Sequence, residues 1–426
     1  MPEIIPFRGS LYNQSKVKLP EVIAPPYDVI SPEFQSRLYD VSPYNVVRLI
    51  LGREEDRYAS AARHLEQWQR EQILVRDAQP ALYVLHQVFE DSGGQEITRK
   101  GFIALCKLEE FEKRIVLPHE KTHAKPREDR LKLFKATNAN FSQVFSLYSD
   151  PGKEIDLVLN GIAKTPPVAT ELFENVENSV WRMTDTNAIR VVQQFLRDKQ
   201  VLIADGHHRY ETALAYRDIM RAKNPSHTGR ELYNYMMMFF TNIDDEGLVI
   251  YPTHRVVHSL PHFDGEAFLK QLEEHFIVRD IRDDDGLQEG MKSSSVMAFG
   301  LALNNNPMRY LLTLKPTPTP QEMIKENIPP EVKVLDVTIL HSLIIKDMLG
   351  ISVEAQEQKT NLEYVKDARQ AIDLVETGHA QLALLMNATK IEQVRAVATA
   401  GHTMPQKSTY FFPKLLSGLV INLLSE

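Results

Sequence analysis

One short segment of the sequence combines groups that could bind a phosphate with groups that could move a proton. It lies between an apolar run at residues 201–204 and a stretch at 210–219 in which apolar residues recur at helical spacing. This change of period predicts a buried strand, a turn and then a helix. The first turn of a helix exposes unpaired backbone N–H groups and carries a partial positive charge, and both favour a phosphate. We therefore expect a polar, anion-binding site formed by Asp205, Gly206, His207, His208 and Arg209.

Each residue of this turn has a role that suits its chemistry. Gly206 permits close approach of the backbone, and Arg209 offers a planar fork of donors to phosphate oxygens. Because imidazole titrates near neutral pH, His207 or His208 could donate to the phosphate or transfer a proton, and Asp205 could accept one. The alternative is that Asp205 only caps the helix and that the histidines lie on the surface.

A second polar segment contains the string His-Glu-Lys-Thr-His at residues 119–123, which has the spacing of a zinc-protease motif. Two zinc-binding histidines of that type need a continuous helix, so that positions i and i+4 project together. Pro118 and Pro126 bracket a stretch with almost no apolar face, which argues against such a helix. We therefore interpret the string, including His123, as accidental.

The same segment suits a loop of mixed charge beside the phosphate site. Glu120 is then a candidate general base, and Lys121 or Arg130 would offset negative charge. His119, Lys121, Thr122 and Arg130 are expected to contact the phosphate. A solvated charged loop is the alternative.

Two further patches carry polar groups on constrained backbone. In the segment Ala-Pro-Pro-Tyr-Asp at residues 24–28, the two prolines fix an extended chain that presents Tyr27 and Asp28 to substrate or metal. Asp28 fits a turn equally well. Near the C-terminus, Lys407, Ser408 and Thr409 form a donor-rich loop among aromatic residues. This loop lacks the glycine spacing of a Walker loop, so phosphate binding and a packed turn both remain open.

The elements that position these groups mix helices and strands. Runs typical of β-strands occur at residues 45–51, 81–89 and 97–105, the last two joined as a hairpin, while 58–72 has helical spacing. The class is therefore α/β, or mixed α+β. At 426 residues the chain exceeds one ordinary core. We expect a phosphate-site domain at 1–257 and an α+β domain at 258–426 that contributes the loop 404–414.

Composition narrows the class of partner. With 43% hydrophobic and 25% charged residues, the chain has the usage of a globular protein. A formal net charge of -8 disfavours nucleic acid. The single cysteine, Cys106, lies in an apolar run and is expected in the core of a protein from a reducing compartment. We see no signal peptide or membrane span, and so expect a cytoplasmic protein.

Several segments, taken in order along the chain, resemble the bacterial and archaeal family DUF1015, and the resemblance covers essentially the whole chain. The family pattern ends at His-Glu-Lys-Thr, so His123 falls outside it. The matching segments are Pro6-Phe7-Arg8, Ala24-Pro25-Pro26-Tyr27-Asp28-Val29-Ile30, His119-Glu120-Lys121-Thr122, Asp129-Arg130-Leu131, Asp205-Gly206-His207-His208-Arg209-Tyr210 and Met404-Pro405-Gln406-Lys407-Ser408-Thr409-Tyr410-Phe411.

The resemblance implies a nucleotide site. The Asp-Gly-His-His-Arg turn is similar to the phosphate-binding turn of the ParB/sulfiredoxin superfamily, which includes partition proteins, sulfiredoxin and an ADP-dependent free serine kinase. It therefore implies a ParB/sulfiredoxin-like N-terminal region and ADP or ATP as cofactor. Family members are often encoded beside enzymes of serine biosynthesis, which favours serine or phosphoserine as substrate.

Two hypotheses follow for function. The first is a Mg²⁺-dependent phosphotransferase or phosphohydrolase acting on a small hydroxylated metabolite, in which Asp205 or Glu120 takes the proton and Lys121 or Lys407 offsets developing charge. The second is a non-catalytic, ParB-like nucleotide switch. The residues favour an enzyme and leave the choice between a monomer and a homodimer open.

Overall fold

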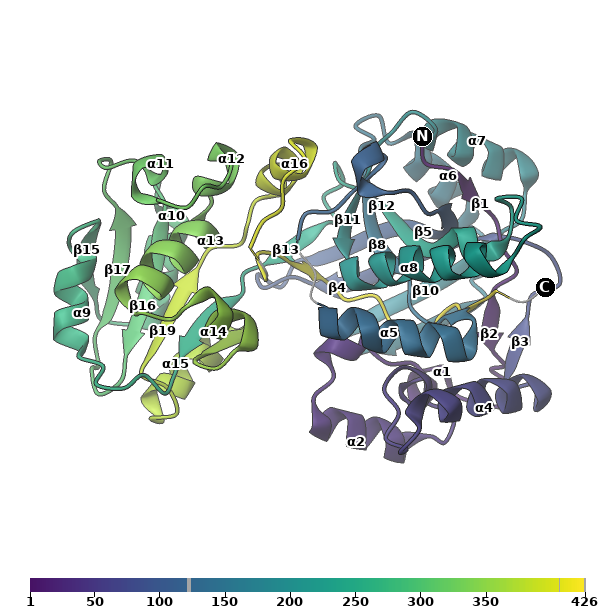
Figure 1. The fold of residues 1–426 in the computed structure, drawn as a ribbon, viewed down its shortest axis with the longest axis horizontal. Helices are drawn as coiled ribbons and strands as arrows, with labels where there is room; N and C mark the ends of the chain where they lie inside the picture. The colour runs from purple at the N-terminus through teal and green to yellow at the C-terminus, as the bar shows by residue number, and fades with distance from the viewer. Residues whose placement is uncertain (121–123, 406, 425–426) are drawn as a thin grey trace. The chain divides into compact units, whose positions relative to one another are not determined.

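The computed structural model describes residues 1–120, 124–405 and 407–424, and the chain forms two compact units. The first unit consists of Met1–Pro118, Thr122–Val249 and Phe411–Glu426. The second consists of His119–Lys121 and Ile250–Tyr410. Both combine helices and strands (Figure 1), which confirms the expected mixed α/β class.

The compact units divide the chain at different places from the sequence-based domains 1–257 and 258–426. β14 (His254–Val257) pairs with β18 (Leu362–Val365) and β19 (Leu382–Met386), and so belongs to the second unit. Near the C-terminus the chain returns to the first unit, where β21 (Asn422–Leu423) pairs with β7 (Ala139–Asn140). The sequence-based domains stay a prediction about which parts fold independently.

A mixed sheet is the centre of the first unit. Its central strands β8 and β12 are buried along their whole length. The hairpin expected from the sequence is confirmed, because β4 and β5 pair antiparallel from Tyr83↔Ile103 to Glu90↔Glu96. Only the β11–β6 and β12–β8 pairs of the described sheet are parallel. The order is β6 (Val116–Leu117), β11 (Val201–Asp205), β8 (Val144–Tyr148), β12 (Tyr235–Asn242), β5 (Glu96–Lys107), β4 (Leu82–Glu90), β10 (Val176–Met183) and β9 (Ala169–Phe173), with β1 (Ile4–Ile5) beside β5.

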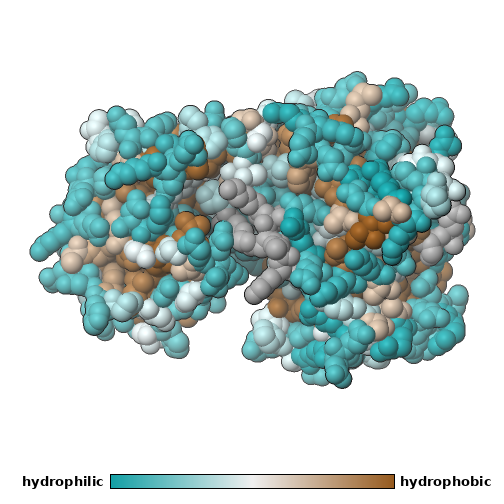
Figure 2. Space-filling view, in the orientation of Figure 1, coloured by the Kyte–Doolittle hydropathy of each residue, from teal (hydrophilic) through white to brown (hydrophobic). Residues whose placement is uncertain are grey.

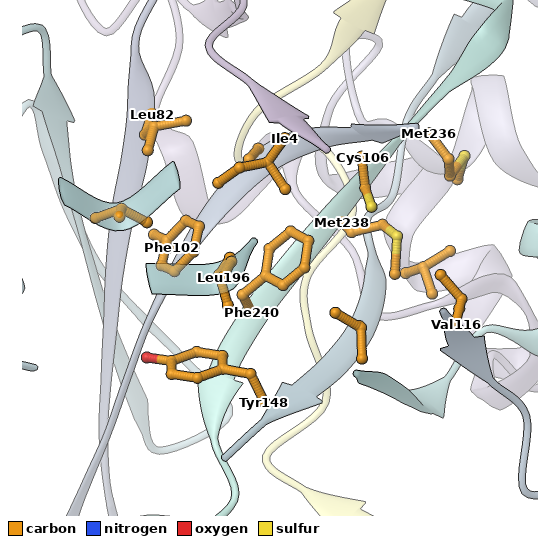
Figure 3. Packing of buried hydrophobic residues seen from close by; sticks show 14 of the residues in the cluster. Ile4, Leu82, Phe102, Cys106, Val116, Tyr148, Leu196, Met236, Met238 and Phe240 are labelled. Atoms are coloured by element: carbon orange, nitrogen blue, oxygen red, sulfur yellow. The ribbon is translucent and has the colours of Figure 1, made fainter. Parts of the chain in front are cut away.

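Helices cover this sheet. α8 (His207–Lys223) lies beside α5 (Ala124–Thr137) over the sheet, as Figure 1 shows, and α5 also contacts α4 (Arg57–Arg70). In the core cluster (Figure 3), the rings of Phe102 and Phe240 stack with centroids 5.1 Å apart. Burial raises the pKa of the Cys106 thiol to about 12, so this residue is a core residue as expected and not a nucleophile. Other helices of the unit are α1 (Leu19–Val22), α2 (Pro32–Val41), α6 (Glu154–Ile162) and α7 (Thr186–Leu196).

One element expected in the first unit is wrong. The run at residues 45–51 contains the helix α3 (Val47–Ile50) instead of a strand. Val46, Val47, Leu49 and Ile50 are all buried, and a segment surrounded by core on all sides shows no period that distinguishes a strand from a helix.

The second unit is built on an antiparallel sheet, which agrees with the expected α+β character. Its core lies between that sheet and helices such as α10 (Asp284–Ser293) and α15 (Ala368–Glu376). One helical segment of this unit begins as α13 (Asp336–Thr338) and continues as the π-helix η4 (Ile339–Met348). Strand order is β15 (Phe276–Ile281), β17 (Arg309–Leu314), β16 (Ala298–Leu303), β19, β14 and β18, and further helices are α9 (Gly265–Leu272), α14 (Val353–Gln358) and α16 (Ile391–Thr399).

The surface of both units is mainly hydrophilic on the face that Figure 2 shows, with groups of hydrophobic residues between the hydrophilic ones. Among the helices that the structure describes, none has both the length and the apolar character needed to cross a membrane.

Candidate functional site

The predicted strand, turn and helix around residues 205–209 are present. β11 ends at Asp205, Gly206 occupies the N-cap position with φ +94°, and α8 begins at His207. A Cβ on Gly206 would lie 2.9 Å from Nη2 of Arg209 and 3.0 Å from its Cζ and Nε. The left-handed backbone and the guanidinium packed against the turn therefore both require glycine at this position.

Asp205 lies between two cations at this helix N-terminus. Its Oδ2 is 2.7 Å from Nζ of Lys414, and its Oδ1 is 3.9 Å from Nη2 of Arg209. The side chains of Asp205 and Lys414 are only 22% and 15% exposed. The N-cap position of α8 is occupied by Gly206, and Asp205 precedes it.

Arg209 is anchored by backbone from the neighbouring strand. Its Nη1 donates to the carbonyl of Gln143, which directly precedes β8. The side chain of Gln143 is fully buried, and neither its Oε1 nor its Nε2 has a hydrogen-bond partner among the described residues. Buried amide groups normally have hydrogen-bond partners. The side chain of Gln143 therefore offers a donor and an acceptor that the described residues do not use.

A cavity of about 60 Å³ adjoins the turn in the first unit, and Tyr27, Arg130 and Arg209 line it together with mainly apolar residues. The guanidinium of Arg130 lies 4.0 Å from the centroid of the Tyr27 ring and donates to the carbonyl of Ile50 at 2.8 Å. Burial raises the pKa of Tyr27 to about 12, although Arg130 acts in the opposite direction. The phenol therefore stays protonated at neutral pH and can donate a hydrogen bond.

Asp129 orients the second guanidinium of this cavity. It accepts from Nε of Arg130 at 2.7 Å and from the hydroxyl of Tyr58 at 2.7 Å, and Arg57 forms an ion pair with it. Burial raises the pKa of Asp129, but Arg130, Tyr58 and Arg57 together bring it below its ordinary value. Asp129 is therefore a carboxylate near neutral pH.

Other predicted residues of the first unit lie outside the cavity lining. His207 is buried and His208 is half-buried, and neither lines the cavity. Asp28 is exposed in the short 3₁₀ turn η1 (Tyr27–Val29). The described part of the chain contains no group of three His, Cys, Asp or Glu side chains that could hold a metal ion. A Mg²⁺ ion held by one carboxylate and the phosphates of a substrate, which is the usual mode for this metal, stays a prediction.

Residues of the two other predicted loops come together in the second unit. The Nε2 of buried His119 lies 2.9 Å from Oγ1 of Thr409, and Glu120 forms a parallel bridge with Met404. The hydroxyl of Ser408 donates to the carbonyl of Pro405 and so closes the loop. Lys407 has a left-handed backbone. Lys121, Thr122, His123 and Gln406 lie outside the described residues.

Sequence reasoning did not find Lys414, Asp129 or Gln143 as parts of the site. Lys414 lies in the loop 404–414, in which the sequence singles out Lys407, Ser408 and Thr409 instead. Asp129 appears only in a segment that resembles the family. The adjacent acid and base at residues 129 and 130 are the one local signal that could have found Asp129. No local pattern links Lys414 or Gln143 to the turn.

Comparisons with known proteins identify a family and distant structural similarity. The sequence model described as "Protein of unknown function (DUF1015)" matches residues 4–338, and no curated protein matches the chain. A conserved hypothetical protein from Pyrococcus furiosus is 14% identical, with a TM-score of 0.34 over 71% of this chain and 90% of that chain.

Two further solved structures show similarity of the same order. A mutant of free serine kinase in complex with ADP is 12% identical, with a TM-score of 0.35 over 71% of this chain and 88% of that chain. SbnI with a C-terminal truncation, from Staphylococcus aureus, is 8% identical, with a TM-score of 0.32 over 75% and 82%. Similarity this distant leaves the function to be argued from the site itself.

Proposed function

The chain belongs to the DUF1015 family of proteins of unknown function, and from the geometry of its site we propose that it binds a nucleotide or another phosphorylated compound and transfers or hydrolyses the phosphoryl group. The observation that carries this proposal is the position of two arginines. Arg209 lies against Gly206 at the first turn of α8, and it lines one cavity together with Arg130.

Cations at the N-terminus of a helix are electrostatically unfavourable unless an anion binds beside them. The N-terminus of a helix carries partial positive charge, and cations placed there lose about 0.3–1 kcal/mol each. Here Arg209 and Lys414 both lie at that end of α8, with Asp205 between them. Within these ion pairs the positive charge exceeds the negative charge, which is the condition that favours a phosphate.

The roles follow from the groups present. Arg209 and the backbone at Gly206 would hold the phosphate, Arg130 would offset charge from the cavity side, and the Tyr27 hydroxyl would donate to a phosphate or acceptor oxygen. Asp205 would accept the proton of the attacking hydroxyl or water. For the acceptor we propose a small hydroxylated metabolite, with serine or phosphoserine the first compounds to test.

Isothermal titration of the full chain against ADP, ATP and phosphoserine, with and without Mg²⁺, tests the proposal. We expect micromolar to millimolar binding of at least one of them, and an Arg209→Gln variant should lose about tenfold or more in affinity. Arg182→Gln is a matched control, since that arginine also pairs with a carboxylate, Asp77, but does not line the cavity. The absence of binding for every phosphorylated ligand would refute the proposal.

A non-catalytic nucleotide switch is the second candidate. One observation favours it: Asp205 is held by Lys414 at 2.7 Å, and a carboxylate stabilised by a cation is a weaker base. Binding without turnover, unchanged in Glu120→Gln, would support the switch. Turnover of the wild type that is lost in Glu120→Gln or Asp205→Asn would support an enzyme.

A further inference from the structure

Lys414 reaches the α8 turn from the far end of the sequence. Its Nζ contacts Asp205, 209 residues earlier in the chain, at 2.7 Å. The residue before it, Pro413, follows Phe411 and Phe412, and Phe411 packs edge-on against Phe145 of β8 with centroids 5.5 Å apart. The C-terminal segment is therefore fastened to the strand beside β11, which places Lys414 next to the turn.

A buried arginine fixes the backbone that carries Lys414. Arg99 is fully buried, donates through Nη2 to the carbonyl of Pro413, and bonds Oε1 of Gln87 through Nε at 3.1 Å. Its guanidinium also lies 4.6 Å from the centroid of the Phe145 ring. These bonds from a buried guanidinium hold the backbone of Pro413, and with it the start of the Lys414 side chain, in a defined position.

The fixed backbone contrasts with the adaptable side chain at its end. A lysine ammonium has three donors on a flexible four-carbon stem, so it can change partners while its backbone stays in place. Its present partner, Asp205, is favoured at the helix N-terminus, whereas Lys414 itself is disfavoured there. A phosphate carries two negative charges and several acceptor oxygens, so it would interact with the helix N-terminus and with Lys414 at the same time. A single carboxylate oxygen interacts less strongly with both.

We propose that Lys414 is a phosphate-binding residue of this site and that Asp205 is its exchangeable partner. This inference rests on the proposed phosphate site. A phosphate of a nucleotide or phosphate monoester that reaches the α8 turn takes the ammonium of Lys414 from Asp205. The carboxylate released in this way regains its basicity, which reconciles the ion pair with a role for Asp205 as proton acceptor.

The first test measures binding of ADP and of inorganic phosphate to the full chain by isothermal titration. Lys414→Met keeps the length of the side chain and removes its charge, and we expect about tenfold or greater loss of affinity for ADP, as for other charge-assisted bonds. Lys414→Arg keeps the charge and should stay within about threefold of the wild type. Lys107→Met is the matched control, because Lys107 forms a 2.8 Å ion pair with Glu3 in the same unit and should leave affinity unchanged.

The second test separates exchange from a purely structural ion pair. If Asp205 competes with the phosphate for Lys414, Asp205→Asn should bind ADP several-fold more tightly than the wild type. This gain should disappear when Asp205→Asn is combined with Lys414→Met, because nothing then remains to compete for. A structural ion pair predicts instead that both single variants lose thermal stability and that neither tightens binding.

The outcomes distinguish this inference from the function it rests on. Wild-type affinity in Lys414→Met, together with lost binding in Arg209→Gln, would reject Lys414 and retain the site. Weaker binding in Asp205→Asn would reject the exchange. A wild type that binds neither ADP nor phosphate would overturn both proposals. If Lys414→Met does not fold, Asp205→Asn still decides, since asparagine preserves the shape of the aspartate that it replaces.

Discussion

Replacement of Gly206 by alanine should damage both stability and ligand binding. The native residue has φ +94°, and an alanine in a left-handed conformation costs about 1–2 kcal/mol. The new Cβ would also lie 2.9 Å from Nη2 of Arg209, so the guanidinium must move. That movement breaks its bond to the carbonyl of Gln143, which as a bond from a charged donor contributes about 1.5–3 kcal/mol.

The two terms together predict a loss of about 2.5–5 kcal/mol in the free energy of unfolding for Gly206→Ala. In a unit of this size each kcal/mol lowers the melting temperature by about 2–4 °C. Since Arg209 is displaced from the phosphate site, the affinity for ADP should fall by about tenfold or more. Thermal unfolding followed by circular dichroism measures the first effect, and isothermal titration measures the second.

Gly229→Ala provides the control for the backbone term alone. Gly229 has φ +87° in the same unit, and a Cβ there meets nothing within 4 Å. This variant should lose only about 1–2 kcal/mol and bind ADP like the wild type. If Gly206→Ala and Gly229→Ala lose equal stability and bind ADP equally well, then Arg209 does not depend on the glycine and the reasoning is refuted.

Three further predictions concern buried polar groups. Burial, reinforced by Arg255, lowers the pKa of His254 to about 4 and of His341 to about 3. Between pH 6.5 and those values the unfolded chain binds protons that the folded chain does not. The free energy of unfolding should therefore fall by about 2 kcal/mol per histidine on going from pH 6.5 to 5. Urea unfolding at several pH values measures this, and an equally steep pH dependence in His341→Gln would contradict it. Asp129→Asn should release Arg130 and weaken ADP binding, whereas Asp77→Asn, which also removes a carboxylate bonded to a tyrosine and an arginine, should cost stability alone. Arg99→Met should lower the affinity for ADP in the wild type but not further in a Lys414→Met background, because Arg99 acts through the position of Lys414; isothermal titration of the two single variants and the double variant measures this.

The tautomer of His341 explains the direction of that pH dependence. The Nε–H of Arg255 can only donate, so Nε2 of His341, 3.1 Å away, must accept. Nδ1 therefore carries the proton and donates to Oε1 of Gln356 at 2.6 Å. Protonation of Nε2 would place two N–H groups against each other next to a buried cation, which opposes the charged form.

Local parts of the fold could be predicted where the apolar residues recur with the period of a strand or of a helix. The β4–β5 hairpin and the junction of β11 with α8 follow from alternation, helical spacing and a glycine at the turn. The run at residues 45–51 was assigned to a strand because its apolar residues are buried on all sides and carry no period, whereas it contains the helix α3. The π-helical pitch of η4 likewise has no signature in the pattern of apolar residues.

The long-range parts of the site could not be predicted for a different reason. The turn at Asp205 takes its partners from Gln143 and Lys414, which meet it only because β8 lies beside β11 and because the C-terminal segment packs on β8. Strand order and register are properties of the whole sheet. A single sequence therefore indicates that Arg209 and Asp205 need partners, but not which residues supply them.

In each unit a buried arginine holds the backbone near a lysine of the C-terminal segment. In the first unit Arg99 holds the carbonyl of Pro413, and in the second unit fully buried Arg255 holds the carbonyl of Lys407 at 3.0 Å. A loop ordered during folding does not have to be ordered again when a ligand binds, so the entropy of its backbone no longer opposes association. What remains to be rearranged is the side chain, and the long stems of Lys407 and Lys414 allow their ammonium groups to change partners. This division between a fixed backbone and an adaptable ammonium is what a site must have if one cation is to exchange a carboxylate of the protein for a phosphate of its ligand.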